Sequence, residues 1–141
     1  MDKHRDLKDI AKDIRKQLKK EFPKCKFSVT IDRFSMGQSM LIALMSAPFA
    51  AFAKDEDVNG NLHKGDYAQL NQYQLRKEPE EYICNGVYLT PEAWAVMKRA
   101  DEIQRQYNWN NSDSQTDYFD VNFYFHPQIG KWDKPFKEQI L

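Results

Sequence analysis

The fold of this chain is decided at residues 22–31, which read Phe22-Pro23-Lys24-Cys25-Lys26-Phe27-Ser28-Val29-Thr30-Ile31. Pro23 disfavours the helical conformation at the residue before it, so a preceding helix must end at Phe22. From Phe27 onward the apolar residues recur at every second position, which is the period of a strand with one buried face. The stretch therefore joins a helix to a strand, and we expect the rest of the chain to pack on this junction.

The residues before the junction predict an amphipathic helix over about residues 2–21. Its apolar positions follow the spacing i, i+3, i+4, i+7 and i+11, which places them on one helical face. These positions are Leu7, Ile10, Ala11, Ile14 and Leu18. Acidic residues gather in the first half of the helix and basic residues in the second half, as the helix dipole favours.

The residues after the junction predict a hairpin. The first strand should cover about residues 26–33, and a turn should follow at Ser35-Met36-Gly37-Gln38. The run 40–45 is apolar at odd and at even positions, which is typical of a strand covered on both faces. Pro48 should close this second strand, because proline cannot donate a hydrogen bond to a strand ladder.

The middle of the chain predicts shorter elements. Residues 54–66 are polar and indicate an exposed loop or a small hairpin. A pattern similar to a capping box begins at Asp66 and predicts a short helix that reaches about residue 75. Within residues 82–89, the pair Asn85-Gly86 predicts two very short strands around a tight turn.

The last third of the chain predicts a second long helix and another strand. Thr90 as the N-cap and Pro91 at the first helical position predict a helix over about residues 91–107. Residues 119–126 alternate between apolar and polar types, and Pro127 should end that strand. The final 14 residues should be irregular, except where three apolar side chains fold back on the body. These are Trp132, Phe136 and Ile140.

Length and composition limit the fold class. A chain of 141 residues with 41% hydrophobic and 13% aromatic residues fits one globular domain over residues 1–141. We therefore predict an α+β fold, in which two main helices pack on an antiparallel sheet of three to five strands.

No motif in the sequence indicates an enzyme, a metal site or a cofactor. The three histidines have no metal-ligand spacing, and the common hydrolase, nucleotide and dinucleotide signatures are absent. Cys25 and Cys84 stand far apart, which is typical of free thiols in a reduced compartment. The most apolar run, residues 40–53, is too short to span a bilayer, and the N-terminus does not read as a signal peptide. We expect a cytoplasmic protein; the sequence carries no signal for its oligomeric state.

The charge distribution suggests a binding surface. Lysines plus arginines balance aspartates plus glutamates at 21 each, yet residues 1–26 carry ten basic and five acidic residues. A basic patch of this density can neutralise several phosphates, although lysine-rich helices are also common for solubility. The predicted nucleic-acid-binding residues are Lys12, Arg15, Lys16, Lys19, Lys20, Lys24 and Lys26. Tyr118 and Tyr124 on an open sheet face would add stacking platforms, if they are not covered by a helix.

The hairpin turn is a second candidate binding site. Small hydrogen-bonding residues beside a guanidinium suit an anion or a partner protein, although an ordinary turn has the same composition. The candidate residues are Arg33, Ser35, Gly37, Gln38 and Ser39.

The first 48 residues resemble an uncharacterised domain of large polyvalent proteins carried by phages and conjugative elements. That domain reads as a helix, then F-P-G-x-K-F-S-V, a turn rich in serine and glycine, and a strand that ends in tryptophan and Asp-Gly-Pro. The corresponding residues here are 22–29, 35–40 and Pro48. The chain departs from this pattern at Lys24, Gln38, Leu44 and Ser46-Ala47. The resemblance implies a phage or mobile-element origin and a module that is not an enzyme.

Two functions follow as hypotheses. The first is a binding module that holds nucleic acid through the basic N-terminal helix. The second is a protein-interaction or anti-defence module that docks on a host protein, through the loop at 54–66 or through Trp132 and Phe136.

Overall fold

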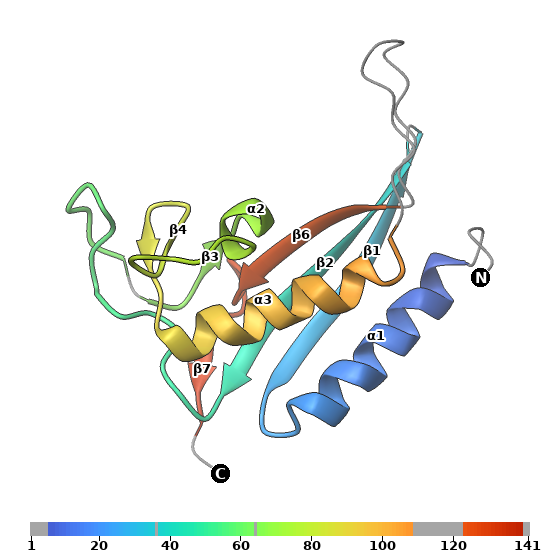
Figure 1. Ribbon diagram of the computed structural model, residues 1–141, viewed down its shortest axis with the longest axis horizontal. Helices are drawn as coiled ribbons and strands as arrows, with labels where there is room; N and C mark the ends of the chain where they lie inside the picture. The colour runs from blue at the N-terminus through green and yellow to red at the C-terminus, as the bar shows by residue number, and fades with distance from the viewer. Residues whose placement is uncertain (1–5, 36, 64, 109–122, 140–141) are drawn as a thin grey trace.

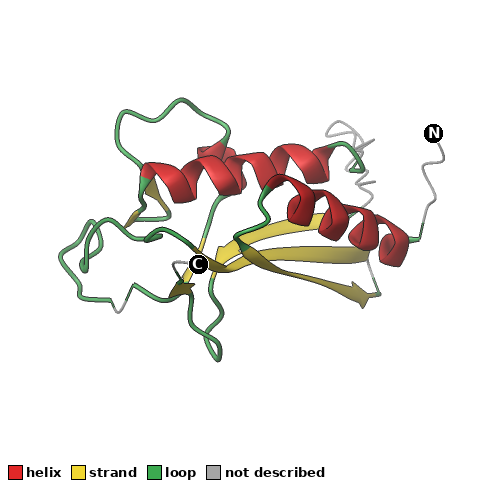
Figure 2. Cartoon of the chain, turned by 90° about the horizontal axis from the view of Figure 1, so that it is seen from below, coloured by secondary structure: helices red, strands yellow, loops and turns green. Residues whose placement is uncertain are grey.

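The computed structural model describes residues 6–35, 37–63, 65–108 and 123–139. Two long helices, α1 (Leu7–Glu21) and α3 (Pro91–Arg105), lie side by side on one face of a sheet (Figure 1). Seen along the sheet, both helices lie on the same side of the strands (Figure 2). The fold is α+β, as the sequence predicts.

The sheet is built around the hairpin at the junction. β1 (Lys26–Phe34) pairs with β2 (Gly37–Ala47) in antiparallel register, with Val29 opposite Ile42. Both strands match their predicted positions, and β2 extends beyond the apolar run at each end. α1 ends where Pro23 requires it to end, and its N-cap is Asp6, whose carboxylate accepts from the backbone N–H of Lys8. The predicted start of this helix at residue 2 lies outside the described residues.

The sheet is mixed, which corrects the expectation of a wholly antiparallel one. β6 (Tyr124–Ile129) pairs in parallel with β2, and β7 (Lys137–Glu138) also runs parallel to β2. β3 (Ala68–Gln69) adds the last strand, so the order is β1-β2-β6-β3. A long connection through α3 separates β2 from β6, and a connection of that length permits a parallel pairing that a tight turn does not.

Pro127 lies inside β6, so the prediction that it ends the strand is wrong. The carbonyl of Pro127 accepts from the backbone N–H of Leu70, on the side of β6 that faces away from β2. Its missing N–H therefore removes no bond from the ladder between β2 and β6. On the same side, the Gln72 side chain donates to the carbonyl of Phe125 at 3.1 Å.

The predicted helix from Asp66 to about residue 75 is wrong in its first half. The chain first forms β3 and then a single helical turn, α2 (Gln72–Leu75). The N-cap is Asn71, whose side chain accepts from the backbone N–H groups of Tyr73 and Gln74. The capping pattern at Asp66 does not start a helix, because Ala68 and Gln69 instead pair with β6 as strand β3.

Two other predictions from local sequence are confirmed. β4 (Ile83–Cys84) and β5 (Val87–Tyr88) pair around Asn85 and Gly86, which both have positive φ. The Thr90 side chain accepts from the backbone N–H of Ala93 and so caps α3. Residues 119–122 of the predicted last strand lie outside the described residues.

The core fills the space between the sheet and the two long helices. Met40, Ile42 and Leu44 on β2 have no exposed surface. The helix face of β6 contributes Phe125 and Ile129. α1 buries its whole apolar stripe, which is Leu7, Ile10, Ala11, Ile14 and Leu18.

A buried polar network joins α2, α3 and the start of β6. Asp101 is fully buried and accepts two hydrogen bonds from Arg76, at 2.8 and 2.9 Å. Gln104 donates to the same carboxylate and accepts from Asn108. The Asn108 side chain in turn donates to the carbonyl of Phe123 and accepts from its N–H. Each member of this network thus has a hydrogen-bond partner, which is what low-dielectric surroundings require.

An ion pair joins the two long helices at the C-terminal end of α1. The Glu21 carboxylate accepts from Arg99 on α3 at 2.7 and 3.0 Å, and from Gln17 one turn earlier. The hydrogen bonds from Arg99, and after them the bond from Gln17, lower the pKa of Glu21. The same carboxylate raises the pKa of Arg99.

A fragment that ends at residue 108 should not fold cooperatively. It lacks β6 and β7 and therefore four buried aromatic or aliphatic side chains, which are Phe123, Phe125, Ile129 and Phe136. Each such side chain contributes about 1.5–3 kcal/mol, so their sum approaches the whole stability of a small domain. Thermal unfolding followed by circular dichroism tests this, with a chain that lacks only residues 140 and 141 as control. A cooperative transition in the fragment would contradict the central role of β6.

Glu21→Gln should lower the free energy of unfolding at pH 7 by about 0.5 kcal/mol, because the two side chains are partly exposed and solvent screens the pair. The pKa of Glu21 is lower in the folded than in the unfolded state. Its contribution is therefore complete above the unfolded carboxyl pKa and disappears as the pH falls through the folded pKa. Urea unfolding should show a larger difference at pH 7 than at about pH 3, because part or all of the contribution is lost as the pH falls. Glu80→Gln, at an exposed glutamate, is the matched control.

Candidate nucleic-acid interface

Four of the seven predicted basic residues form one stripe along α1. They follow the spacing i, i+3, i+4 and i+7, so their side chains leave the helix on the same side. All four are exposed, and we call them the basic stripe: Lys12, Arg15, Lys16 and Lys19. The opposite side of α1 carries Gln17 and Glu21, which face α3. α1 is therefore polarised across its axis, and its positive side points away from the second helix.

Arg15 fixes where the stripe lies relative to the sheet. Its guanidinium donates to the backbone carbonyl of Val29 at 2.6 Å. Val29 belongs to β1, which is the outermost strand on this side of the sheet. The basic stripe therefore runs beside the outer edge of β1, where a long ligand has access.

The other three predicted basic residues are exposed but point elsewhere. Lys20 lines a groove of about 450 Å³ together with Lys16 of the basic stripe, Asp13 and Glu21, so both lysines have surroundings of mixed charge. Lys24 lies in the turn between α1 and β1. Lys26 begins β1 and lines a pocket beside β7. Lys24 and Lys26 thus lie beyond the end of α1, outside the basic stripe.

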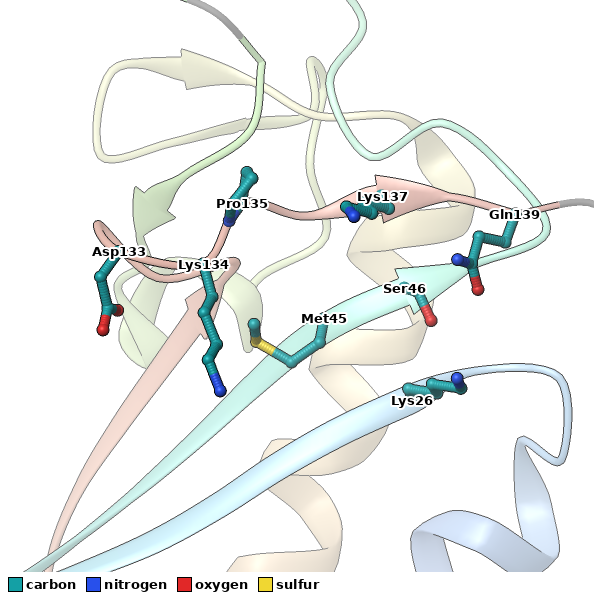
Figure 3. Close-up of a pocket in the computed structure, with 8 residues that line it drawn as sticks. All are labelled: Lys26, Met45, Ser46, Asp133, Lys134, Pro135, Lys137 and Gln139. Carbon is teal, nitrogen blue, oxygen red and sulfur yellow. The ribbon is translucent and has the colours of Figure 1, made fainter.

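The pocket at Lys26 contains basic residues that sequence reasoning missed. Lys134 and Lys137 approach from the C-terminal segment, and Ser46 and Gln139 add polar groups (Figure 3). The pocket has a volume of about 320 Å³. These lysines stand in a segment with no helical or strand periodicity, so only the folded chain shows that they meet Lys26.

The predicted turn site is mostly strand. Gly37, Gln38 and Ser39 pair with residues of β1 as the first residues of β2. Arg33 forms an ion pair with Asp6 at 2.6 Å. The hydrogen bond from the backbone N–H of Lys8, and after it the charge of Arg33, lowers the pKa of that carboxyl below its usual value. Only Ser35 remains in the turn itself, where it is exposed. The guanidinium therefore already has an anionic partner.

An aromatic pair lies on the sheet near this turn. The rings of Phe34 and Tyr124 stack with centroids 6.2 Å apart, and the two residues are 47% and 43% exposed. Tyr124 thus has the exposure that a stacking platform needs. His126 is exposed two residues further along β6, as its place in the predicted alternation indicates. The predicted platform at Tyr118 lies outside the described residues.

The described residues contain neither a metal-binding cluster nor a membrane-spanning helix. No group of three or more histidine, cysteine, aspartate or glutamate side chains among them is placed to hold a metal ion. Within the same ranges, no helix combines the length and apolar character needed to cross a membrane. Cys25 and Cys84 are free thiols, and burial raises the pKa of each.

Comparison with known proteins identifies the family. No curated protein and no solved structure matches the chain. Residues 5–108 match the family described as large polyvalent protein associated domain 29. The match contains the junction at 22–31 and the whole hairpin, and it continues through α3, well beyond the residues that carry the resemblance in the sequence. The chain therefore belongs to the family of large polyvalent protein associated domain 29.

Proposed function

We propose that this domain is a binding module that is not an enzyme, and that it holds nucleic acid along the basic stripe of α1. The observation that carries the proposal is the polarity of α1. Glu21 is engaged by Arg99, whereas the four cationic side chains of the basic stripe are exposed on the other side of the helix. The family supports a setting in large polyvalent proteins. We further propose a phage or conjugative-element origin and a cytoplasmic location.

The stripe suits a phosphate backbone better than a single small anion. Four cationic side chains on successive turns of a 15-residue helix span about 10 Å along its axis, since each residue adds about 1.5 Å. Backbone phosphates recur on a similar scale, and each one neutralised releases counterions. The open edge of β1 beside the stripe leaves room for a strand to pass. Recognition of this kind reads charge and not base sequence.

The double variant Lys16→Glu and Lys19→Glu should weaken binding to single- or double-stranded DNA or RNA at least about tenfold. The slope of log K against log salt should fall by about 1.4 to 1.8, which corresponds to two lost phosphate contacts. Gel-shift or fluorescence-anisotropy titrations at several salt concentrations measure both quantities. The proposal fails if the wild-type protein shows no salt-dependent binding.

A charge-matched control separates a local site from a global effect. Lys54→Glu together with Lys77→Glu changes the net charge by the same amount at two exposed positions away from α1. These substitutions should leave most of the affinity intact. Equal losses in the two double variants would show that only the net charge matters.

The docking alternative is favoured by one observation. Trp132 is 84% exposed at the tip of the turn between Lys131 and Lys134, and exposed tryptophans are frequent anchors at protein interfaces. In the loop at 54–66, Leu62 is 83% exposed. Phe136, the other aromatic anchor proposed from the sequence, packs into the core at 8% exposure. It therefore cannot serve as an anchor without unfolding β7.

If Trp132 anchors a host protein, that protein should remain bound to the wild-type domain after nuclease treatment. Trp132→Ala should then reduce its affinity by about 2 kcal/mol or more. The variant with Lys16→Glu and Lys19→Glu should retain the same partner. Isothermal titration with the purified partner measures the difference, and a partner lost on nuclease treatment would argue against docking.

A further inference from the structure

The pocket beside β7 gathers three lysines from distant parts of the chain. Lys26 begins β1, Lys134 ends a tight turn after β6, and Lys137 lies in β7. Figure 3 shows these side chains around the end of β2, with Ser46 and Gln139 beside Lys137 and Lys26. The basic stripe of α1 contributes no residue to this pocket, which therefore needs its own explanation.

The backbone around the pocket is held at several points. Lys131 and Lys134 exchange backbone hydrogen bonds at 2.7 and 3.1 Å, which closes the turn. Lys137 pairs with Ser46 in β7, and the N–H of Gln139 donates to the carbonyl of Ala47 at 2.7 Å. The lysine stems thus start from fixed positions, which lowers the entropy cost of gathering them around a ligand.

Two irregular backbone features shape this corner of the fold. The register between β1 and β2 shifts at Lys26, so that Met45 has no direct partner opposite it. A bulge of this kind turns side chains away from the regular alternation and is common beside functional sites. Gly130 has φ of 64°, and a Cβ there would lie 2.0 Å from the carbonyl oxygen of Asp66. Only glycine lets the chain leave β6 and return along the pocket.

The charge of the pocket suits a dianion. Its lining contains three lysines and one acidic residue, Asp133, which leaves a formal net charge of +2. None of the three lysines has an ion-pair partner among the described residues. Lys131, just outside, donates to the hydroxyl of Ser28 at 2.8 Å and adds positive charge nearby. The three positive charges face one pocket, and a bound anion would reduce the repulsion among them.

We propose that this pocket binds a phosphate monoester, either the terminal phosphate of a nucleic-acid strand or the phosphate of a free nucleotide. A monoester carries a charge of about −1.5 to −2 at neutral pH, whereas each internal phosphate of a strand carries one. The volume of about 320 Å³ lies at the small end of the range for ligand sites. Ser46 and Gln139 supply hydrogen-bonding groups beside the charges. This site extends the proposed function and does not depend on it, because a free nucleotide requires no contact with α1.

The test titrates the full chain with adenosine monophosphate and with adenosine, and follows the amide signals of Ser46 and Lys137 by NMR. The nucleotide should shift these signals in a saturable way, and the nucleoside should not. The variant Lys134→Gln and Lys137→Gln keeps the side-chain stems and should weaken nucleotide binding at least about tenfold. Affinity for the nucleotide should also fall as the pH decreases through about 6, because the monoester then loses its second charge.

The source of the phosphate is distinguished by two oligonucleotides of one sequence, with a 5′-phosphate or a 5′-hydroxyl. If the strand end is the ligand, the wild-type protein prefers the phosphorylated oligonucleotide. The double glutamine variant should lose this preference but still bind the 5′-hydroxyl form as the wild type does. If the nucleotide binds and the preference is absent, the ligand is a free nucleotide. Lys16→Glu with Lys19→Glu should leave nucleotide binding unchanged, so the two proposals fail separately. The pocket proposal is wrong if the wild type and the double glutamine variant bind the nucleotide equally well. Thermal unfolding curves must show that both proteins are folded.

Discussion

β2 is the strand on which the rest of the structure depends, because it is hydrogen-bonded on both sides. β1 pairs with it in antiparallel and β6 in parallel direction, and its residues Met40, Ile42 and Leu44 have no exposed surface. Both long helices pack on the face that these residues present. The family match ends at residue 108, whereas β6, which completes the ladder of β2, lies beyond it. The fold of the described residues thus includes a strand that the matched segment does not supply.

The elements that the sequence predicts well are those whose signals are local. The stripe of α1, the alternation in β1, the cap at Thr90 and the Asn85-Gly86 turn each depend on neighbours within a few positions. The errors concern partners distant in the chain. A proline interrupts a strand only where its missing N–H faces a hydrogen-bonded neighbouring strand. The sequence alone does not show which side of β6 faces away from β2. The direction of β6 is likewise set by where α3 returns the chain.

The candidate nucleic-acid interface is likewise predicted where its signal is local, and missed where it depends on distant parts of the chain. Helical spacing is enough to place Lys12, Arg15, Lys16 and Lys19 on one side of α1, and the structure agrees. It does not show that Lys20 faces a groove of mixed charge or that Arg33 is paired with Asp6. Lys134 and Lys137 carry no periodic signal, and they line one pocket with Lys26 only because β7 joins β2. Charge counted along the chain therefore locates basic segments, whereas the surface they share is a property of the fold.

Side-chain and backbone donors cover several backbone carbonyls at the edges of the sheet. This affects whether a strand of another protein can pair there. Arg15 covers the carbonyl of Val29 on one border, and Gln72 and the backbone of Leu70 cover those of Phe125 and Pro127 on the other. A foreign strand that tried to add itself to either border would have to displace these donors, and at Pro127 it would find no N–H to accept from. Strand addition is therefore disfavoured at these three carbonyls, whereas the rest of the outer edge of β1 stays accessible.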